Sequence, residues 1–577
     1  MKKLLVYLKN YIKESILGPL FKLLEATFEL IVPLVVASII DTGIANSDKN
    51  YVITRVLILV LLGVVGLTCS LTAQYFAAKA ACGFATELRH SLFKHIQGLS
   101  FSEIDEMGTA RLITRMTSDV NSVQGCVNMV LRLFLRSPFI VFGAMIMAFT
   151  IDVKCALIFC VAIPALAVVV FAVMLASIPL YKKVQAGVDR TLKITRENLA
   201  GTRVIRAFNR QQDEIDTFNE SNLHLTKVQL FAGKVSALMN PITFVVINVA
   251  MVVLIYTGGI QVDNGILTQG QVVALVNYMS QILVELVKLA NLIIQITKAL
   301  ASANRIEEVF ETESSMAFPE KSVESGYSPY AVEFNNVSLT YKNGGAESLS
   351  NINFKVRKGE TIGIIGGTGS GKSSLVNMIP RFYDATVGEV KVNGVNVKDY
   401  TKEELRETVG IVMQKAVLFN GSIRDNIRWG RNDATDEDIM KAIRNAQAEE
   451  FVLDKEGVLD FNIAQGGRNL SGGQRQRLTI ARALVKEPQI LILDDSASAL
   501  DYVTDAKLRK AVRELGGNMT TFIVSQRTAS LRNADKIIVL EDGEIAGMGT
   551  HEELLQNCEI YQEIYNTDSN KAAGGAN

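Results

Sequence analysis

The chain has 577 residues with 59 Lys and Arg against 59 Asp and Glu, so its formal net charge is zero. Nucleic acid binds proteins through excess positive charge, and this balance therefore gives no indication of a nucleic-acid partner. Hydrophobic residues make up 49% and charged residues 20%, and the mean hydropathy is +0.23. These values exclude a disordered chain and are high for a soluble protein with an ordinary charged surface.

The long apolar runs lie in the first half of the chain. Each reaches the length of about 20 residues that a helix needs to cross a bilayer core. The loops at about 79–131 and 181–238 are too long for simple turns, and their periodic polarity predicts that the membrane helices continue beyond the lipid. The sequence thus predicts six transmembrane helices with long cytoplasmic extensions, at 16–44, 53–80, 130–151, 156–180, 241–260 and 267–300.

Basic residues cluster at the N-terminus and in the two long loops, whereas the short loops carry little more than Lys49 and Lys154. Cytoplasmic loops carry the excess of Lys and Arg, so both termini and both long loops are predicted to be cytoplasmic. The first apolar run is too long for a signal peptide. We therefore expect a multi-pass protein of the cell membrane, in contact with its lipids. Its first 15 residues are expected to form an amphipathic helix on the inner membrane surface.

The chain changes character near residue 316. A polar, irregular segment at 316–330 is predicted to be a linker. Beyond it, short β-rich runs such as 360–366 and 488–494 alternate with charged helical stretches, as in α/β domains. We predict an α-helical membrane domain at 1–315, the linker at 316–330, and a cytoplasmic α/β domain at 331–577.

The segment from Gly366 to Ser373 has the spacing G-x-x-x-x-G-K-S, directly after an apolar strand and ahead of a helical stretch at 374–382. This is the context of a P-loop, in which backbone N–H groups and a helix N-terminus surround phosphate oxygens. Lys372 is expected to reach the β- and γ-phosphates and the Ser373 hydroxyl to bind Mg²⁺. The competing interpretation is a glycine-rich turn without a ligand, and the strand and helix on either side argue against it.

Two further motifs follow downstream. An apolar strand ends at Asp494, which suits an aspartate that orients Mg²⁺, although a core strand running into a loop gives the same pattern when alone. Between this strand and the P-loop the sequence reads LSGGQ at 470–474. With these motifs in this order, residues 331–565 resemble the nucleotide-binding domain of an ABC transporter. The predicted fold of this half is an α/β P-loop NTPase domain of ABC type.

The resemblance implies roles for further residues and names ATP and Mg²⁺ as cofactors. Tyr341 resembles the aromatic residue that stacks on adenine, Gln414 the Q-loop glutamine that touches Mg²⁺ and the attacking water, and the segment from Ser498 to Asp501 the D-loop. Ser373, Gln414 and Asp494 are expected at the metal. The residues expected at ATP are Tyr341, Gly366, Gly367, Thr368, Gly369, Ser370, Gly371, Lys372, Ser373, Ser374, Gln414, Ser471, Gly472, Gly473, Gln474 and Asp501.

The first half of the chain agrees with this resemblance. Residues 101–120 and 197–210 resemble the intracellular loops of ABC exporters, which carry short coupling helices that touch the nucleotide domains. Six spans fused ahead of one nucleotide domain resemble a half-transporter, so that two chains make a working unit. The resemblance implies ATPase activity and export of drugs or other lipophilic compounds.

Two positions depart from the family pattern at the expected catalytic residues, which are Asp495, Gln526 and Gln414. Asp495 stands where the family usually has a glutamate that polarises the attacking water, and Gln526 where it usually has a histidine. The shorter side chain pulls the carboxylate back by about 1.5 Å, and a misplacement near 1 Å costs about 10²-fold in rate. Gln can still hydrogen-bond a phosphate but cannot become a cation.

Both departures concern the γ-phosphate. We therefore predict that this chain holds ATP at a degenerate, slow site, and that a second half-transporter supplies the Glu and His of a fast one. The intact LSGGQ of this chain is expected to complete the partner's site. The alternatives are a homodimeric exporter of lipid or peptide with two slow sites, an importer built on the exporter fold, and a subunit that binds ATP only structurally.

Charged residues inside the spans are costly and therefore informative. Glu25 and Glu29 share one helix face in the first span, and Glu285 lies with Lys288 on a polar stripe of the last span. Glu25, Glu29 and Glu285 are hypothesised to bind amphipathic cationic substrates. The competing interpretation is internal pairing, for example of Glu285 with Lys288. Arg136, near the inner end of the third span, is expected to snorkel or to pair.

Overall fold

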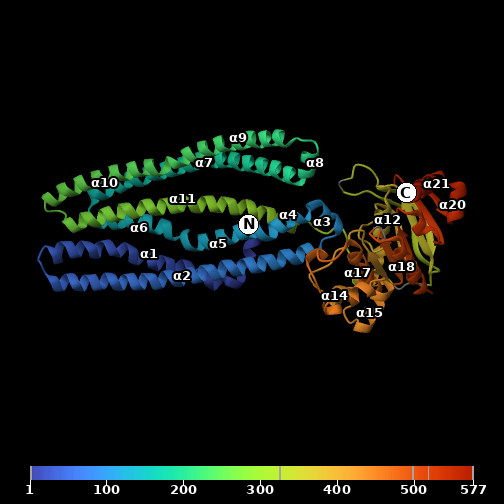
Figure 1. The fold of residues 1–577 in the computed structure, drawn as a ribbon. Coiled ribbons are helices and arrows are strands. Elements are labelled where there is room, and N and C mark those ends of the chain that lie inside the picture. The colour runs from blue at the N-terminus through green and yellow to red at the C-terminus, as the bar shows by residue number, and fades with distance from the viewer. Residues whose placement is uncertain (1–2, 324–326, 343, 497–498, 518, 575–577) are drawn as a thin grey trace. The chain divides into compact units, whose positions relative to one another are not determined.

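The computed structural model describes residues 3–323, 327–342, 344–496, 499–517 and 519–574, with side chains described up to Asp568. It consists of two compact units, which Figure 1 shows as a bundle of long helices and a mixed α/β body. The first unit comprises Met1–Gln97 and Ala110–Thr312, and the second comprises Gly98–Thr109 and Glu313–Asn577. The segment Gly98–Thr109 is therefore grouped with the C-terminal unit, although it leaves the second spanning helix.

Long helices make up the N-terminal unit. Among the described residues, six stretches of 42 to 53 residues are long and apolar enough to cross a membrane: Lys3–Ile44, Lys49–Gly98, Thr109–Ile151, Val153–Ala200, Gln211–Asp263 and Gln269–Glu311. At 1.5 Å per residue, such helices are about twice as long as the ~30 Å hydrocarbon core of a bilayer. The predicted fold class, six spans with long extensions beyond the lipid, is confirmed.

These six stretches are built from shorter elements, which Figure 1 shows running side by side. The N-terminal segment forms a 3₁₀-helix that leads directly into α1, where the sequence predicts an amphipathic helix. Two π-helical turns interrupt the stretches at Ile39–Ile44 and Arg115–Asp119. The elements are the 3₁₀-helix Lys3–Tyr11, α1 (Ile12–Ser38), α2 (Lys49–Gly98), α4 (Thr109–Thr114), α5 (Val120–Leu133), α6 (Arg136–Ile151), α7 (Val153–Ala200), α8 (Thr202–Ala207), α9 (Gln211–Ala237), α10 (Met239–Asp263) and α11 (Gln269–Glu311).

The beginning of α11 is hydrogen-bonded to the π-helical turn that follows α1. Gly270 donates its backbone N–H to Asp41 Oδ1 at 2.7 Å, and the Thr268 hydroxyl donates to Asp41 Oδ2 at 2.5 Å. A Cβ on Gly270 would lie 2.4 Å from the carbonyl oxygen of Ala37, so only glycine allows the two backbones to approach this closely. Thr268 also forms a capping box with Gln271, which satisfies N–H groups at the helix start.

The C-terminal unit is built around two main sheets. A six-stranded sheet has the order β12-β11-β3-β10-β9-β6, in which all neighbours are parallel except β11 and β12. A four-stranded antiparallel sheet has the order β2-β1-β4-β5, and β7 pairs with β8. The strands are β1 (Tyr330–Leu339), β2 (Leu349–Arg357), β3 (Thr361–Gly366), β4 (Val387–Val392), β5 (Val395–Asn396), β6 (Val409–Val412), β7 (Gly421–Ser422), β8 (Asn462–Ile463), β9 (Ile490–Asp494), β10 (Thr520–Val524), β11 (Lys536–Glu541) and β12 (Glu544–Gly549).

Helices pack around these sheets and close the core. All five residues of β9 are buried, as expected for a parallel strand covered on both faces. The helices are α3 (Phe101–Met107), α12 (Lys372–Met378), α13 (Lys402–Thr408), α14 (Ile423–Arg428), α15 (Asp436–Asn445), α16 (Glu449–Leu453), α17 (Gly472–Leu484), α18 (Tyr502–Glu514), α19 (Thr528–Leu531), α20 (His551–Asn557) and α21 (Glu559–Gly574), with single 3₁₀ turns at Val397–Asp399, Val458–Asp460 and Gln465–Gly467.

The helix that follows the P-loop differs from the prediction at both ends. The sequence predicts a helix at 374–382, whereas α12 runs from Lys372 to Met378. It begins earlier because Gly371, with φ 94°, ends the loop immediately before Lys372. It stops near Pro380 because proline has no N–H to continue the helical hydrogen bonds, and the next residue, Arg381, has a positive φ of 53°.

Candidate functional site

The predicted phosphate-binding residues lie at one edge of the six-stranded sheet. The P-loop follows β3, Asp494 ends β9, Gln414 comes two residues after β6, and Gln526 comes two residues after β10. These four strands are neighbours and run parallel in the order β3-β10-β9-β6. Because the carboxyl ends of parallel strands meet at the same edge, the topology alone gathers these side chains.

A cavity of about 520 Å³ opens at this edge. Lys372, Ser373, Gln414, Asp494 and Asp495 line it, together with Thr368, Gly369, Gly371 and Gln526. A Cβ on Gly371 would lie 2.7 Å from the carbonyl oxygen of Ser348, and the φ of 94° strains any other residue, so the loop needs glycine there. The volume and the polar lining suit a nucleoside triphosphate.

Lys372 lies inside the loop that it belongs to. Its ammonium group donates to the carbonyl oxygens of Gly366 at 2.9 Å and of Gly367 at 2.5 Å, and lies 3.3 Å from Ser370 Oγ. Burial lowers the pKa of Lys372, while Asp495 and Asp494 oppose that effect. A partly buried cation held by neutral carbonyl groups is ready to exchange them for phosphate oxygens, because hydrogen bonds between charged groups are stronger.

The groups expected at Mg²⁺ also lie together. Ser373 donates its hydroxyl to Asp494 Oδ1 at 3.1 Å. Burial raises the pKa of Asp494, and the Ser373 hydrogen bond opposes that shift. Within the described ranges, no group of three His, Cys, Asp or Glu side chains is placed to hold a metal. One hydroxyl, one carboxylate and one amide fit Mg²⁺, which keeps several waters and takes its other oxygens from phosphates.

Asp495 and Gln414 meet across the cavity. Gln414 Nε2 donates to Asp495 Oδ2 at 3.4 Å, and the backbone N–H of Asp495 donates to Val524 O at 3.0 Å. Burial raises the pKa of Asp495, while the hydrogen bond from Gln414 and the charges of Lys372 and Arg527 lower it. A carboxylate with a raised pKa at the phosphate end of a cavity can accept a proton from water.

Ser374 lines the cavity, whereas Tyr341 is not among the described residues that line it and is connected to it through Ser374. Tyr341 comes two residues after β1 and donates its hydroxyl to Ser374 Oγ at 2.9 Å. Burial raises the pKa of Tyr341, so the hydroxyl stays a neutral donor. This bond places the aromatic ring beside the residue that follows the P-loop lysine and serine.

The LSGGQ segment does not contribute to this cavity. Among the described residues that line it, none belongs to 470–474, and Asp501 is absent from that set as well. Ser471 instead caps α17: its hydroxyl accepts the N–H of Gln474 at 3.2 Å, and Gln474 Oε1 accepts the N–H of Ser471 at 3.0 Å. Asp501 likewise caps α18 through Thr504. Ser498 of the predicted D-loop lies outside the described residues.

The structure gives each of the three carboxylates proposed for cationic substrate a cationic partner on this chain. Arg136 Nη1 donates to Glu285 Oε1 and Nη2 to Glu29 Oε2, both at 2.6 Å, and Nη2 lies 4.0 Å from Glu25 Oε1. We call the following six side chains the Arg136 network: Lys22, Glu25, Glu29, Arg136, Glu285 and Lys288. Two further ion pairs complete it, from Lys22 to Glu25 at 2.5 Å and from Lys288 to Glu285 at 2.8 Å.

The Arg136 network is the feature that sequence reasoning missed, although pairing of Arg136 and of Glu285 with Lys288 was expected. Ser137 adds a hydrogen bond to Glu285 Oε2 at 2.7 Å. Arg136 and Glu285 are 6% and 2% exposed. The Arg136 side chain is therefore buried and paired, and it does not snorkel to the membrane surface. The available signal was the cation itself at the start of an apolar helix, since a buried arginine requires carboxylates.

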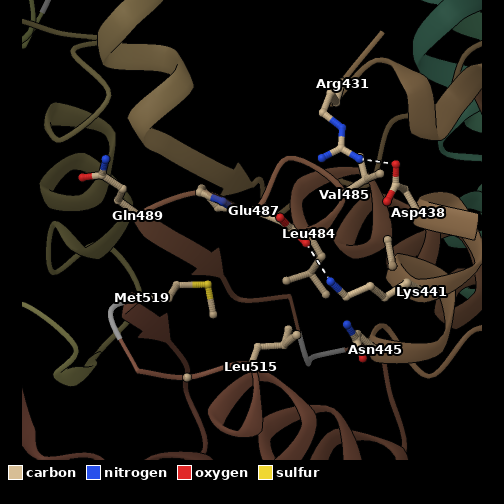
Figure 2. Close-up of a pocket in the computed structure, with 13 residues that line it drawn as sticks. Arg431, Asp438, Lys441, Asn445, Leu484, Val485, Glu487, Gln489, Leu515 and Met519 are labelled. Atoms are coloured by element: carbon tan, nitrogen blue, oxygen red, sulfur yellow. Dashed lines mark hydrogen bonds and ion pairs between the residues drawn. The ribbon is translucent and has the colours of Figure 1, made fainter. Parts of the chain in front are cut away.

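A second cavity of about 370 Å³ lies elsewhere in the C-terminal unit, between α15 and the segments that follow α17 and α18 (Figure 2). Its charged residues pair with one another, Arg431 with Asp438 at 2.5 Å and Lys441 with Glu487 at 2.8 Å. Figure 2 shows the Arg431–Asp438 pair next to Val485, and the Lys441–Glu487 pair next to Leu484. None of the described residues that line this cavity is a predicted site residue.

Comparisons with known proteins agree with this arrangement. Residues 15–286 match the family "ABC transporter transmembrane region", and residues 349–498 match the family "ABC transporter". An uncharacterized ABC transporter ATP-binding protein of Mycobacterium tuberculosis is 36% identical over 563 residues, which cover 96% of each chain. A Bacillus subtilis protein named as a proposed multidrug export ATP-binding/permease protein is 32% identical over 98% of each chain.

A solved structure described as a bacterial Atm1-family ABC exporter with ATP bound has a TM-score of 0.78 to this chain. It covers 96% of this chain and 98% of its own, at 22% identity, so the likeness concerns the fold. Fold and site define an ATP-binding membrane transporter subunit. The chain belongs to the ABC transporter family, as a half-transporter with six membrane spans fused to one nucleotide-binding domain. Its α/β domain binds ATP, and ATPase activity follows from its family.

Proposed function

We propose that this chain is one half of an ATP-driven heterodimeric exporter in the cell membrane. We further propose that its own Walker site, the ATP site formed by the P-loop and Asp494, hydrolyses ATP slowly. Asp495 supports this proposal, because its short carboxylate lies with Gln414 at the phosphate end of the cavity, where Gln526 also stands. The groups for binding are all present there: Lys372, Ser373 and Asp494. The site is thus equipped to hold Mg²⁺ and ATP and lacks the usual base and histidine for rapid hydrolysis.

A partner chain accounts for two further features. LSGGQ caps α17 and does not line this chain's own cavity, so it is available to a second Walker site. The region of α8 also exposes apolar side chains, with Leu199 73% and Phe208 74% exposed. Exposed apolar groups of this size mark interaction sites, which fits a second half-transporter. We propose the domain bounds 1–315, 316–330 and 331–577, with both termini in the cytoplasm.

ATP turnover by this chain purified alone in lipid tests the proposal, with Lys372→Ala as background. We expect turnover at background, because a self-paired complex has the same short carboxylate at both sites. Co-expression with the second half-transporter should restore it. Turnover well above background from the chain alone would instead establish a homodimer in which Asp495 acts as an effective catalytic base.

For cargo we propose lipophilic, cationic compounds, in keeping with a Bacillus relative that is named for multidrug export. Glu29 is the carboxylate of the Arg136 network that we assign to substrate, because its side chain is 40% exposed whereas that of Glu285 is 3% exposed. Export of a cationic dye from cells should fall in a Glu25→Gln, Glu29→Gln variant. Unchanged export would remove both residues from the proposal and leave them a structural role.

A further inference from the structure

The short helix α3 contacts the nucleotide-binding fold next to the P-loop helix. Tyr383, which follows α12, donates its hydroxyl to Asp105 Oδ2 of α3 at 2.6 Å. The ring of Phe101, also on α3, lies 4.7 Å from that of Phe382 and 6.2 Å from that of Tyr383. All these residues belong to the same compact unit. The segment 382–383 is therefore held by α3 through one hydrogen bond and a group of aromatic contacts.

Tyr383 in turn packs against the ring assigned to adenine. The rings of Tyr383 and Tyr341 are 5.0 Å apart at an interplanar angle of 88°, the edge-to-face arrangement that aromatic pairs prefer. Tyr341 is fixed at its other end by the hydrogen bond to Ser374. A continuous chain of contacts thus runs from Asp105 through Tyr383 and Tyr341 to Ser374.

A second contact joins α3 to the same place. Lys342, the neighbour of Tyr341 in the sequence, lies 3.5 Å from Glu103 Oε1 and 3.7 Å from Glu106 Oε2. The side chain of Glu103 is fully buried. Because Lys342 is itself half-exposed, this pair contributes little energy, but it is a second contact between α3 and the segment that carries Tyr341. Burial, together with the hydrogen bond to Asp105, raises the pKa of Tyr383, so its hydroxyl remains a donor at neutral pH.

We propose that Asp105 and Tyr383 are positioning residues for the Tyr341 ring, so that α3 controls recognition of the nucleotide base and not of its phosphates. This inference rests on the proposed stacking of adenine on Tyr341. The phosphate-binding groups have separate contacts, since Lys372 bonds to Gly366 and Gly367 and Ser373 to Asp494. Disturbing the chain of contacts from α3 should therefore change affinity for the base alone.

The experiment uses the full chain in its membrane assembly, and the label is measured on this chain alone. A low concentration of 8-azido-ATP is photocrosslinked, the subunits are separated on a gel, and displacement by ATP or by inorganic tripolyphosphate is measured. In Tyr383→Leu we expect ATP to displace the label about three- to tenfold less well, because the edge-to-face contact is lost. Displacement by tripolyphosphate, which has no base, should stay unchanged.

Three companion variants sharpen this result. Tyr383→Phe keeps the ring and loses only the bond to Asp105, so about a twofold effect is expected. Tyr400→Phe is the matched control: it removes a buried hydroxyl that donates to Val392 O at 2.9 Å, a bond outside the chain of contacts from Asp105 to Ser374, and should leave both displacements unchanged. In a Tyr341→Ala background, Tyr383→Leu should cause no further loss of ATP affinity.

Two outcomes would overturn the inference while leaving ATP binding by the chain intact. One is an equal loss for tripolyphosphate and ATP in Tyr383→Leu, which would show a general disturbance of the site. The other is an additional loss when Tyr383→Leu is combined with Tyr341→Ala, since the two residues would then act independently. If Tyr341→Ala alone binds ATP normally, the assignment of that ring to adenine fails, and the role of α3 fails with it.

Discussion

Replacing Asp495 by Glu is expected to raise ATP hydrolysis at this chain's own Walker site by about 10²-fold. The longer side chain moves the carboxylate outward by about 1.5 Å, toward the expected position of the attacking water. The backbone N–H of residue 495 already bonds to Val524 O, so the change is confined to the side chain. The measurement is steady-state hydrolysis by the heterodimer after the partner's own Walker lysine has been replaced, which leaves this chain's site as the source of turnover.

Asp495→Asn is the control for this result, because it keeps the size of the side chain and removes the base. It should hydrolyse ATP no faster than the unmodified complex. Binding of ATP should be the same in all three proteins, since Lys372, Ser373 and Asp494 are untouched. A rate for Asp495→Glu that stays at the level of Asp495→Asn would show that the length of this side chain does not limit hydrolysis.

Replacing Arg136 by Met should strongly destabilise the membrane half of the protein. Glu285 would lose a partner at 2.6 Å while it remains 2% exposed, and Glu29 would lose its partner as well. Removing one member of a buried ion pair costs about 3–5 kcal/mol, and here Lys22 and Lys288 would be left to balance three carboxylates. Thermal unfolding of the complex in detergent, monitored by loss of the monodisperse species, should show a clear fall in the midpoint.

Two further variants test whether the loss of stability comes from the buried charges. Arg210 forms an ion pair with Asp213 on the surface and is 71% exposed, so Arg210→Met should change stability by less than about 1 kcal/mol. Adding Glu285→Gln to Arg136→Met removes the excess negative charge of the network and should recover part of the lost stability. Equal midpoints for Arg136→Met and Arg210→Met would mean that the Arg136 network adds nothing to stability.

The parts of the site that sequence could predict are those whose chemistry fixes both residue type and spacing. A phosphate-binding loop needs glycines, Lys372 and Ser373 within one short segment, and a buried strand ending in Asp494 is equally local. Hydropathy located the six spans for a similar reason, because the bilayer thickness sets the length of a spanning helix. The predicted helix at 374–382, by contrast, overlooked Pro380, which lies two residues beyond the end of α12.

The remaining contacts depend on how distant segments pack. Arg136 meets Glu29 and Glu285 across 107 and 149 residues, and Tyr383 meets Asp105 across 278 residues. No local pattern specifies these pairs, because each depends on the packing of separate helices. The helical stripe of Glu25 and Glu29 showed that these carboxylates face a common direction, but not that a cation from α6 would meet them.

The charges of the Arg136 network also affect how the transporter responds to the voltage across the membrane. It contains three cationic and three carboxylate side chains, joined through Arg136, and so carries no net charge. The electrical work on a moving group is about 2.3 kcal/mol per elementary charge per 100 mV. A network that moves as a neutral body experiences none of this work. Movement of the Arg136 network should therefore add no dependence on the voltage across the membrane, and a voltage dependence of export would come from the charge of the cargo.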